Sequence, residues 1–233
     1  MRKFYSSSLT LLAALFLCAS CGGNQPDAAV TMPQQQAATP TPAPNRPKIV
    51  ALGDSLTAGY GLSLHESYPA LLQEKLDRDG FDYEVVNAGV SGDTTAGGLR
   101  RLDWALEGDV RFLILELGAN DILRGLPAAE MRKNLSQIIE LARGRGAEVL
   151  LAGMLAPTNS GAQYSRESME VFPALAKEYN LTFIPFFLER VAGIENLNQA
   201  DGVHPNPEGT RIVAETVYQH LKPMLEKQKN DAR

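Results

Sequence analysis

Cysteine is scarce in this sequence. Only two occur among 233 residues, at Cys18 and Cys21, so the body of the chain has neither a disulfide framework nor a cysteine-ligated metal site. The three histidines, His65, His204 and His220, are too few and too scattered for a histidine-rich metal centre. We therefore expect no metal and no cofactor. One imidazole is nevertheless enough for general-base catalysis, so the search turns to oxygen and nitrogen side chains.

The N-terminal apolar run is too short for a transmembrane helix. It extends from Leu9 to Leu17, whereas a helix needs about 20 apolar residues to cross a bilayer. Basic residues precede the run and small residues follow it, which is typical of a secretory signal. We assign residues 1–20 to a signal peptide and expect an exported protein.

The end of this signal resembles a bacterial lipobox, in which small residues precede a cysteine that is lipidated and becomes the mature N-terminus. Here Ala19 and Ser20 precede Cys21, although Cys18 stands where a leucine is usual. The resemblance implies a lipoprotein held at a membrane through Cys21, facing the periplasm or the cell surface. The alternative is a soluble protein with a cleaved signal and an incidental cysteine.

A proline-rich segment, residues 21–47, follows the signal. Residues 24–47 contain six of the fourteen prolines of the chain and show no apolar periodicity. Such a composition cannot bury enough side chain to offset the entropy of ordering it. It predicts a flexible tether that holds a folded domain off a membrane surface.

Basic clusters are lacking as well. Beyond residue 20 the chain has 20 Lys and Arg against 27 Asp and Glu, which gives a net charge of −7. An acidic protein without basic clusters or interleaved aromatic residues is not expected to bind nucleic acid.

Residues 48–233 are expected to form one α/β domain. Their number suffices for one sizeable core and is small for two. Five short apolar segments rich in β-branched residues are typical of buried parallel strands, and they span 48–52, 83–87, 112–117, 148–152 and 182–184. Helical patterns lie between them, and this alternation predicts a doubly wound parallel sheet covered by helices on both faces.

Three helices are indicated by apolar side chains at helical spacing. One contains Leu99, Leu102 and Leu106 on a single face. The last helix begins with Asn206 as N-cap and Pro207 at its first position. The third has Met131, Leu135, Ile138, Ile139 and Ala142 on one face.

Polar residues follow the predicted strands. Sites in open α/β sheets form beyond the carboxyl ends of the strands, so these segments are the place to search for function. Four of them contain, in chain order, Ser55, Gly92, Asn120 and His204. We expect the four to meet at one edge of the sheet.

Ser55 and His204 suit nucleophilic catalysis. A serine hydroxyl needs a base within hydrogen-bond reach, and that base needs a third group to orient it. Because Pro205 disfavours helical geometry at His204, a loop can bring Asp201 against the imidazole. We therefore predict Ser55 as nucleophile, His204 as general base and Asp201 as its orienting acid. The alternatives are a helix-capping serine, a turn histidine and a turn-capping aspartate.

Acyl transfer also needs hydrogen-bond donors for the developing oxyanion. The candidates are the backbone N–H groups of Ser55 and Gly92 and the side-chain amide of Asn120. Gly92 can equally be required by a backbone conformation, and Asn120 can cap the helix that follows it. We interpret Asp54 as bracing its loop and not as the base.

These residues lie in blocks that resemble those of the GDSL, or SGNH, hydrolase family. The order of the blocks and their positions after the strands make the resemblance specific. The sequence is most similar to the periplasmic thioesterase/lysophospholipase and arylesterase branch. The resemblance implies a three-layer α/β/α fold with a five-stranded parallel sheet, like that of flavodoxin. The blocks are Gly53-Asp54-Ser55-Leu56, Ser91-Gly92-Asp93-Thr94, Gly118-Ala119-Asn120-Asp121 and Asp201-Gly202-Val203-His204-Pro205.

The resemblance also implies a function. A member of this family would hydrolyse carboxylic esters or thioesters through an acyl-serine intermediate, as a monomer acting on a lysophospholipid, an acyl-thioester or an aryl ester. The loop after the fourth strand, with Met154, Leu155 and Pro157, would form the wall of the acyl pocket. A sugar O-acetyl esterase is the alternative enzyme. A binding lipoprotein of the cell envelope without catalytic activity is the alternative from another class.

Overall fold

The computed structural model describes residues 46–157 and 160–231. The predicted signal peptide, Cys21 and the proline-rich segment as far as residue 45 lie outside these residues. Within the two described ranges, no helix is both long enough and apolar enough to cross a membrane.

Five parallel strands form a sheet in the order β2-β1-β3-β4-β5. Each of the five predicted strands is confirmed, with ends that differ from the prediction by no more than two residues. The central strands are buried on both faces, which explains their continuous apolar sequences. The strands are β1 (Lys48–Gly53), β2 (Glu84–Gly89), β3 (Val110–Glu116), β4 (Glu148–Ala152) and β5 (Thr182–Ile184).

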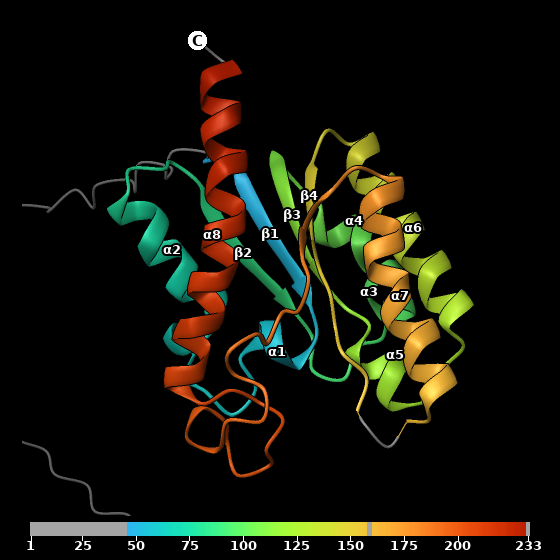
Figure 1. Cartoon of the computed structure of the whole chain (residues 1–233). Helices are drawn as coiled ribbons and strands as arrows, with labels where there is room; N and C mark the ends of the chain where they lie inside the picture. Colours follow the sequence, from blue (N-terminus) through green and yellow to red (C-terminus); the bar gives the residue numbers. More distant parts are fainter. Residues whose placement is uncertain (1–45, 158–159, 232–233) are drawn as a thin grey trace, which may run out of the picture. The chain divides into compact units, whose positions relative to one another are not determined.

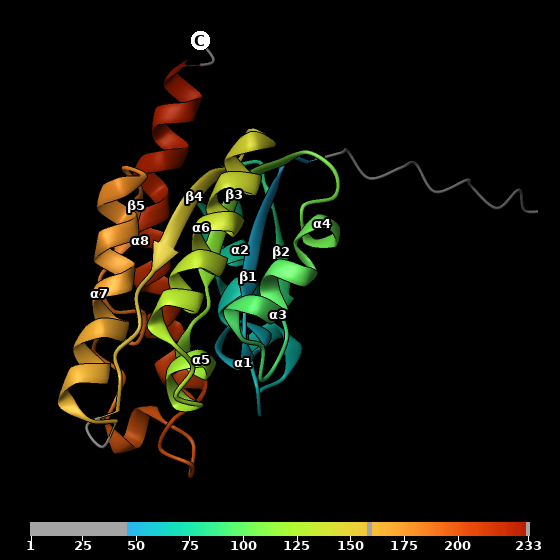
Figure 2. The ribbon, with the colours of Figure 1, turned by 90° about the vertical axis from the view of Figure 1, so that its right-hand side faces the viewer.

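Helices cover both faces of the sheet, as Figures 1 and 2 show, so the predicted three-layer α/β/α fold is confirmed. On one face α2 (Tyr68–Arg78) packs against α8 (Pro207–Asp231), and on the other α6 (Ala128–Gly144) packs between α3 (Thr95–Arg100) and α7 (Ala162–Glu178). Shorter elements complete the described chain: α1 (Ser55–Ala58), α4 (Leu102–Ala105), α5 (Ala119–Leu123) and two 3-10 turns, Leu64–Glu66 and Glu195–Leu197.

Two of the three predicted helices have the expected form. The apolar face predicted for α6 is buried in full. At the start of α8, the Asn206 side-chain oxygen accepts hydrogen bonds of 3.0 Å from the N–H groups of Glu208 and Gly209. Asn206 therefore caps the helix as predicted, with Pro207 as the first helical residue.

The helix predicted around Leu99, Leu102 and Leu106 is wrong in one respect. The chain forms two short helices there, α3 and α4, separated at Arg101, whose backbone has φ −104° and ψ 6°. The Arg101 side chain donates hydrogen bonds to carbonyl groups of β1 and β2. The helical spacing of the three leucines gives no sign of the break at Arg101.

The order of the strands indicates where a crevice forms at the edge of the sheet. The chain passes from β1 to β2 on one side and returns to β3 on the other, so the direction of winding reverses at β1. Crevices at the carboxyl ends of strands form at such reversals. The segments that follow β1, β2 and β3 therefore meet at this crevice.

Candidate active site

Ser55 is the first residue of α1 and is separated from β1 by Asp54 alone. The Asp54 side chain caps this helix by accepting a hydrogen bond of 3.0 Å from the N–H of Leu56. Ser55 is therefore not the capping residue, and its own N–H, at the first turn of a helix, has no intrahelical acceptor. The short turn leaves Ser55 on the wall of a cavity.

His204 connects Ser55 to Asp201. Its Nε2 lies 2.9 Å from the Ser55 hydroxyl oxygen, and its Nδ1 lies 2.7 Å from Oδ2 of Asp201. The other Asp201 oxygen accepts hydrogen bonds from the backbone N–H groups of His204 and Val203, at 3.0 Å and 2.9 Å. These backbone hydrogen bonds, together with the imidazole, lower the Asp201 pKa to about 2. The Asp201 carboxylate is thus ionised at neutral pH.

Tyr60 packs against the imidazole, a contact that sequence reasoning missed. The two ring centroids are 4.8 Å apart, with the planes tilted by 43°. The backbone of Tyr60 is held by Gln199, whose side chain donates a 2.7 Å hydrogen bond to the Tyr60 carbonyl. Tyr60 therefore limits the movement of the His204 ring. Its sequence position, in a glycine-flanked loop, carries no signal for this role.

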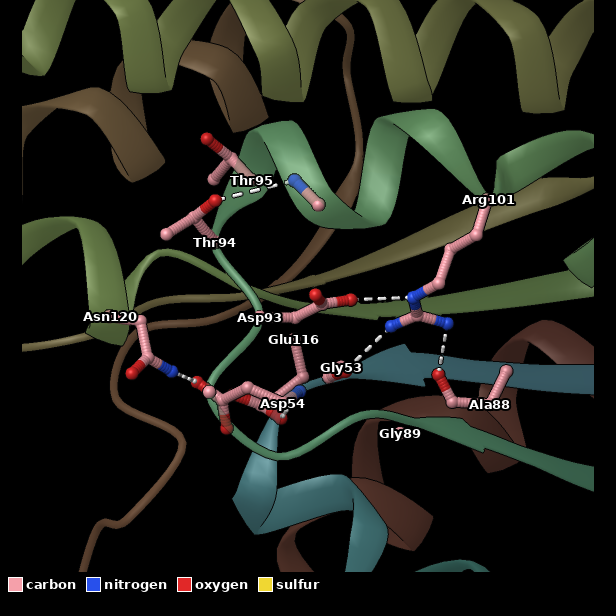
Figure 3. Close-up of polar contacts among 12 residues, drawn as sticks. Gly53, Asp54, Ala88, Gly89, Asp93, Thr94, Thr95, Arg101, Glu116 and Asn120 are labelled. Atoms are coloured by element: carbon pink, nitrogen blue, oxygen red, sulfur yellow. Dashed lines mark hydrogen bonds and ion pairs between the residues drawn. The ribbon is translucent and has the colours of Figure 1, made fainter.

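Gly92 and Asn120 line the same cavity as Ser55. Gly92 has φ +82°, a conformation that favours glycine, and its N–H donates to no group in the described part of the chain. Asn120 is the second residue of α5, whose N-cap is Gly118, so the capping alternative for Asn120 is wrong. One hydrogen of the Asn120 amide is donated to Asp54 Oδ2 at 2.9 Å, and Figure 3 shows this contact.

The cavity has a volume of about 940 Å³ and is mostly apolar. The structure brings together on its wall Ser55, His204, Gly92 and Asn120, while Asp201 lies behind His204. The loop after β4 also contributes, because its residues Met154, Leu155 and Pro157 line the cavity. Further apolar wall comes from Leu56, Tyr60, Ala119, Leu123, Ala156, Phe186, Leu188, Ala192 and Val203.

Asp54, the residue before Ser55, and Glu116 form a pair of buried acids (Figure 3). Glu116 ends β3 and is fully buried, and its Oε2 accepts hydrogen bonds from the Asp54 N–H at 3.2 Å and the Thr57 hydroxyl at 2.7 Å. Gly53 makes room for it, since a Cβ there would lie 2.4 Å from Oε2. Sequence reasoning missed Glu116, although an acid within an apolar strand was an available signal.

Burial raises the pKa of both acids. The Asp54 pKa rises to about 6, opposed by the hydrogen bonds from Leu56 and Asn120. The Glu116 pKa rises well above its ordinary value because of burial and the neighbouring charge of Asp54. Asp54 receives two N–H donors, whereas Glu116 Oε1 is buried without a partner in the described chain. We infer that Glu116 keeps its proton to a higher pH than Asp54 does.

Replacing Glu116 with glutamine should therefore change how stability depends on pH. A carboxyl whose pKa is raised on folding stabilises the protein below its unfolded pKa, and this contribution is lost as the pH rises through the folded pKa. Wild type should lose stability relative to the variant as the pH rises above 4.5, the ordinary glutamate value. The slope is at most about 1.4 kcal/mol per pH unit. Urea unfolding at pH 5 and pH 8 measures the difference.

Glu148 provides the matched control, since it also lies in a strand but is exposed. Glu148→Gln should change the free energy of unfolding by the same amount at both pH values. A pH-independent difference between wild type and Glu116→Gln would contradict the proposed protonation of Glu116.

In residues 46–157 and 160–231, no group of three His, Cys, Asp or Glu side chains is arranged to hold a metal ion. The chemistry available to the described site is that of a hydroxyl, an imidazole, a carboxylate and a set of N–H donors. Such a set can transfer an acyl group through a serine ester.

Comparisons with known proteins agree with this chemistry. Residues 51–212 match the model of the GDSL-like Lipase/Acylhydrolase family. The esterase TesA of Pseudomonas aeruginosa is 41% identical over 198 residues, which cover 84% of this chain and 95% of the relative. Thioesterase 1/protease 1/lysophospholipase L1 of Escherichia coli is 37% identical over 178 residues, 76% of this chain and 84% of the relative. The crystal structure of AlinE4, an SGNH-hydrolase family esterase, has 45% identity and a TM-score of 0.65, and the match covers 77% of this chain and 97% of that one.

Proposed function

Because this chain belongs to the GDSL-like lipase/acylhydrolase family and is a carboxylic ester hydrolase, we propose that Ser55, His204 and Asp201 are its catalytic residues. One observation carries the proposal. The Ser55 hydroxyl, the two imidazole nitrogens and the Asp201 carboxylate form a continuous line of hydrogen bonds, 2.9 Å and 2.7 Å long, at the wall of the cavity.

The reaction proceeds through an acyl-serine. Ser55 Oγ attacks the substrate carbonyl carbon while Nε2 of His204 takes the hydroxyl proton. Asp201 accepts the Nδ1–H and stabilises the imidazolium. His204 then donates this proton to the oxygen or sulfur of the leaving group as its bond to the carbonyl carbon breaks. Water then attacks the carbonyl carbon of the acyl-serine while His204 takes its proton. The ester bond to Ser55 breaks, His204 gives the proton to Ser55 Oγ, and the carboxylic acid is released.

Three donors are proposed for the oxyanion: the N–H of Ser55, the N–H of Gly92 and the amide of Asn120. Asn120 has two amide hydrogens, and Asp54 accepts one of them. The position of that hydrogen bond directs the second hydrogen away from Asp54, so that it is available to an oxyanion. Oxyanion-hole donors of this kind contribute about 3–4 kcal/mol each to transition-state stabilisation.

We propose that the cavity holds the acyl chain of a lysophospholipid, an acyl-thioester or an aryl ester. Its volume, about 940 Å³, exceeds what an acetyl group needs, and its apolar wall suits an alkyl chain. The buried Met154, the exposed Leu155 and the half-buried Pro157 lie on one side of it. These features favour a longer acyl group over the acetyl group of an acetylated sugar.

Replacing Leu155 with asparagine, which has a similar size, should weaken binding of long acyl chains. We expect kcat/KM for a p-nitrophenyl octanoate to fall about tenfold, since loss of an apolar contact costs about 1–3 kcal/mol. The value for p-nitrophenyl acetate should change less than about twofold, because an acetyl group does not reach this wall. The ratio of the two kcat/KM values is the measurement.

Leu141 is the control for this substitution. It lies on α6, does not line the cavity, and is 46% exposed against 53% for Leu155. Leu141→Asn should leave the ratio unchanged. An equal fall in kcat/KM for both esters in Leu155→Asn would show that Leu155 is not part of the acyl-binding wall.

The function is tested by covalent labelling. A fluorophosphonate reacts with an activated serine, so it should label this protein at Ser55, as located by peptide mass analysis. Absence of labelling would favour a binding protein without catalysis. Preferential hydrolysis of acetylated glycans over long acyl esters would favour the sugar O-acetyl esterase.

We also propose that the protein is an exported lipoprotein. The support is the signal-like sequence of residues 1–20, the lipobox-like segment ending at Cys21 and the small residues around it. A diacylglycerol mass on the mature N-terminal cysteine would support this proposal, and a mature chain with an unmodified N-terminus would contradict it.

A further inference from the structure

Arg101 occupies the interruption between α3 and α4. Its side chain is 17% exposed and donates hydrogen bonds in three directions. Nε contacts Oδ2 of Asp93 at 2.6 Å, Nη1 contacts the Ala88 carbonyl at 2.6 Å, and Nη2 contacts the Gly53 carbonyl at 2.8 Å. Figure 3 shows the guanidinium group between these three acceptors.

Each acceptor belongs to a segment of the catalytic edge. Gly53 ends β1 and lies two residues before Ser55, Ala88 lies near the end of β2, and Asp93 follows Gly92. The Gly53 carbonyl also accepts a 3.0 Å hydrogen bond from Val90. The guanidinium group therefore joins the segment before the nucleophile to the loop that carries Gly92.

Gly92 is held from two sides. On one side its neighbour Asp93 is paired with Arg101, and on the other its carbonyl accepts a 2.7 Å hydrogen bond from Nη2 of Arg124. The Arg124 contact is exposed, whereas both members of the Asp93–Arg101 pair are 17% exposed. Solvent competes less with the Arg101 pair, so this pair has the larger influence on the loop.

We propose that Arg101 is a positioning residue for the esterase reaction: through Asp93 it orients the Gly92 N–H toward the oxygen that becomes negatively charged when Ser55 attacks. This inference rests on the proposed role of Ser55 and extends it. A planar guanidinium group can bond three acceptors at fixed angles, and an ammonium group cannot reproduce that pattern. The role accordingly requires arginine at this position.

The test compares Arg101→Ala, Arg101→Lys and the control Arg132→Ala. Displacing an oxyanion donor by about 1 Å costs about 100-fold in rate, so kcat of Arg101→Ala on p-nitrophenyl butyrate should fall about 100-fold with KM nearly unchanged. Arg101→Lys retains a charge beside Asp93 and should be folded but also impaired in kcat. Arg132 forms an ion pair with Glu178 between α6 and α7, away from the cavity, and its loss should not alter kcat.

Two further measurements separate positioning from general support of the fold. Millimolar guanidinium, well below denaturing concentrations, should restore part of kcat in Arg101→Ala by occupying the vacated space. Asp93→Ala should lower kcat similarly, and the double variant should be no slower than either single variant, because both act by one route. Full additivity of the two effects, or an unchanged kcat in folded Arg101→Lys and Arg101→Ala, would overturn the proposal.

Failure of this inference is distinct from failure of the proposed function. If Ser55→Ala is inactive and Arg101→Ala retains its kcat, Ser55 remains the nucleophile and only the role of Arg101 is rejected. If Ser55→Ala retains activity, the catalytic assignment and the role of Arg101 are both rejected.

Discussion

Ser55→Ala should lower kcat for hydrolysis of a short p-nitrophenyl ester by a factor of order 10⁶, as loss of the nucleophile does in triad hydrolases. The variant has no oxygen to form the acyl-enzyme, while the donors and the apolar cavity remain. Substrate binding should therefore persist although turnover is lost. Steady-state kinetics and fluorophosphonate labelling are the measurements, and both signals should disappear together.

The fold should be unaffected by this substitution, because the Ser55 side chain is not the helix cap and contacts His204 at the cavity wall. Equal thermal melting of wild type and Ser55→Ala would show this. Ser165, on α7 and away from the cavity, serves as a control, and Ser165→Ala should retain full activity. Undiminished turnover in Ser55→Ala would reject Ser55 as the nucleophile.

Asp201→Asn should lower kcat by about 10⁴-fold with little change in KM. The asparagine carbonyl oxygen can still accept the hydrogen bonds from the N–H groups of Val203 and His204, so the loop is retained. The amide nitrogen that replaces Oδ2 donates hydrogen bonds and cannot accept one from Nδ1–H. His204 then favours the tautomer with hydrogen on Nε2, which cannot take the proton of Ser55.

Asp103 is the control for this variant. It is an exposed aspartate on α4 whose ion-pair partner is Arg145, remote from the cavity. Asp103→Asn should leave kcat unchanged. A loss smaller than about tenfold in Asp201→Asn would mean that Asp201 only caps its turn, because a triad acid contributes far more.

The proposed catalytic residues could be predicted from the sequence because each lies in a short segment whose local chemistry is informative. Asp201 and His204 are three residues apart on a loop, so sequence spacing alone brings them into contact. Ser55, Gly92 and Asn120 come from separate segments, and the parallel sheet rule places the ends of those segments together.

Side chains with partners in distant segments of the chain were not predicted. Glu116 accepts a hydrogen bond from the N–H of Asp54, 62 positions away, and Arg101 donates one to the carbonyl of Gly53 in β1, 48 positions away. Tyr60 meets His204 only because the loops after β1 and β5 converge. No spacing within the sequence relates these residues to their partners.

The sequence by itself therefore determined the strands, the order of the catalytic blocks and the type of chemistry. Continuous apolar runs are required wherever a strand is buried on both faces, and a serine nucleophile requires a base and an orienting acid. Only the tertiary structure decided that Asp54 and Glu116 form a buried acid pair, that Tyr60 packs on the imidazole and that Arg101 joins β1, β2 and the Gly92 loop. The physical reason is that hydrogen bonding and burial depend on distance in space, which the folded sheet sets for residues far apart along the chain.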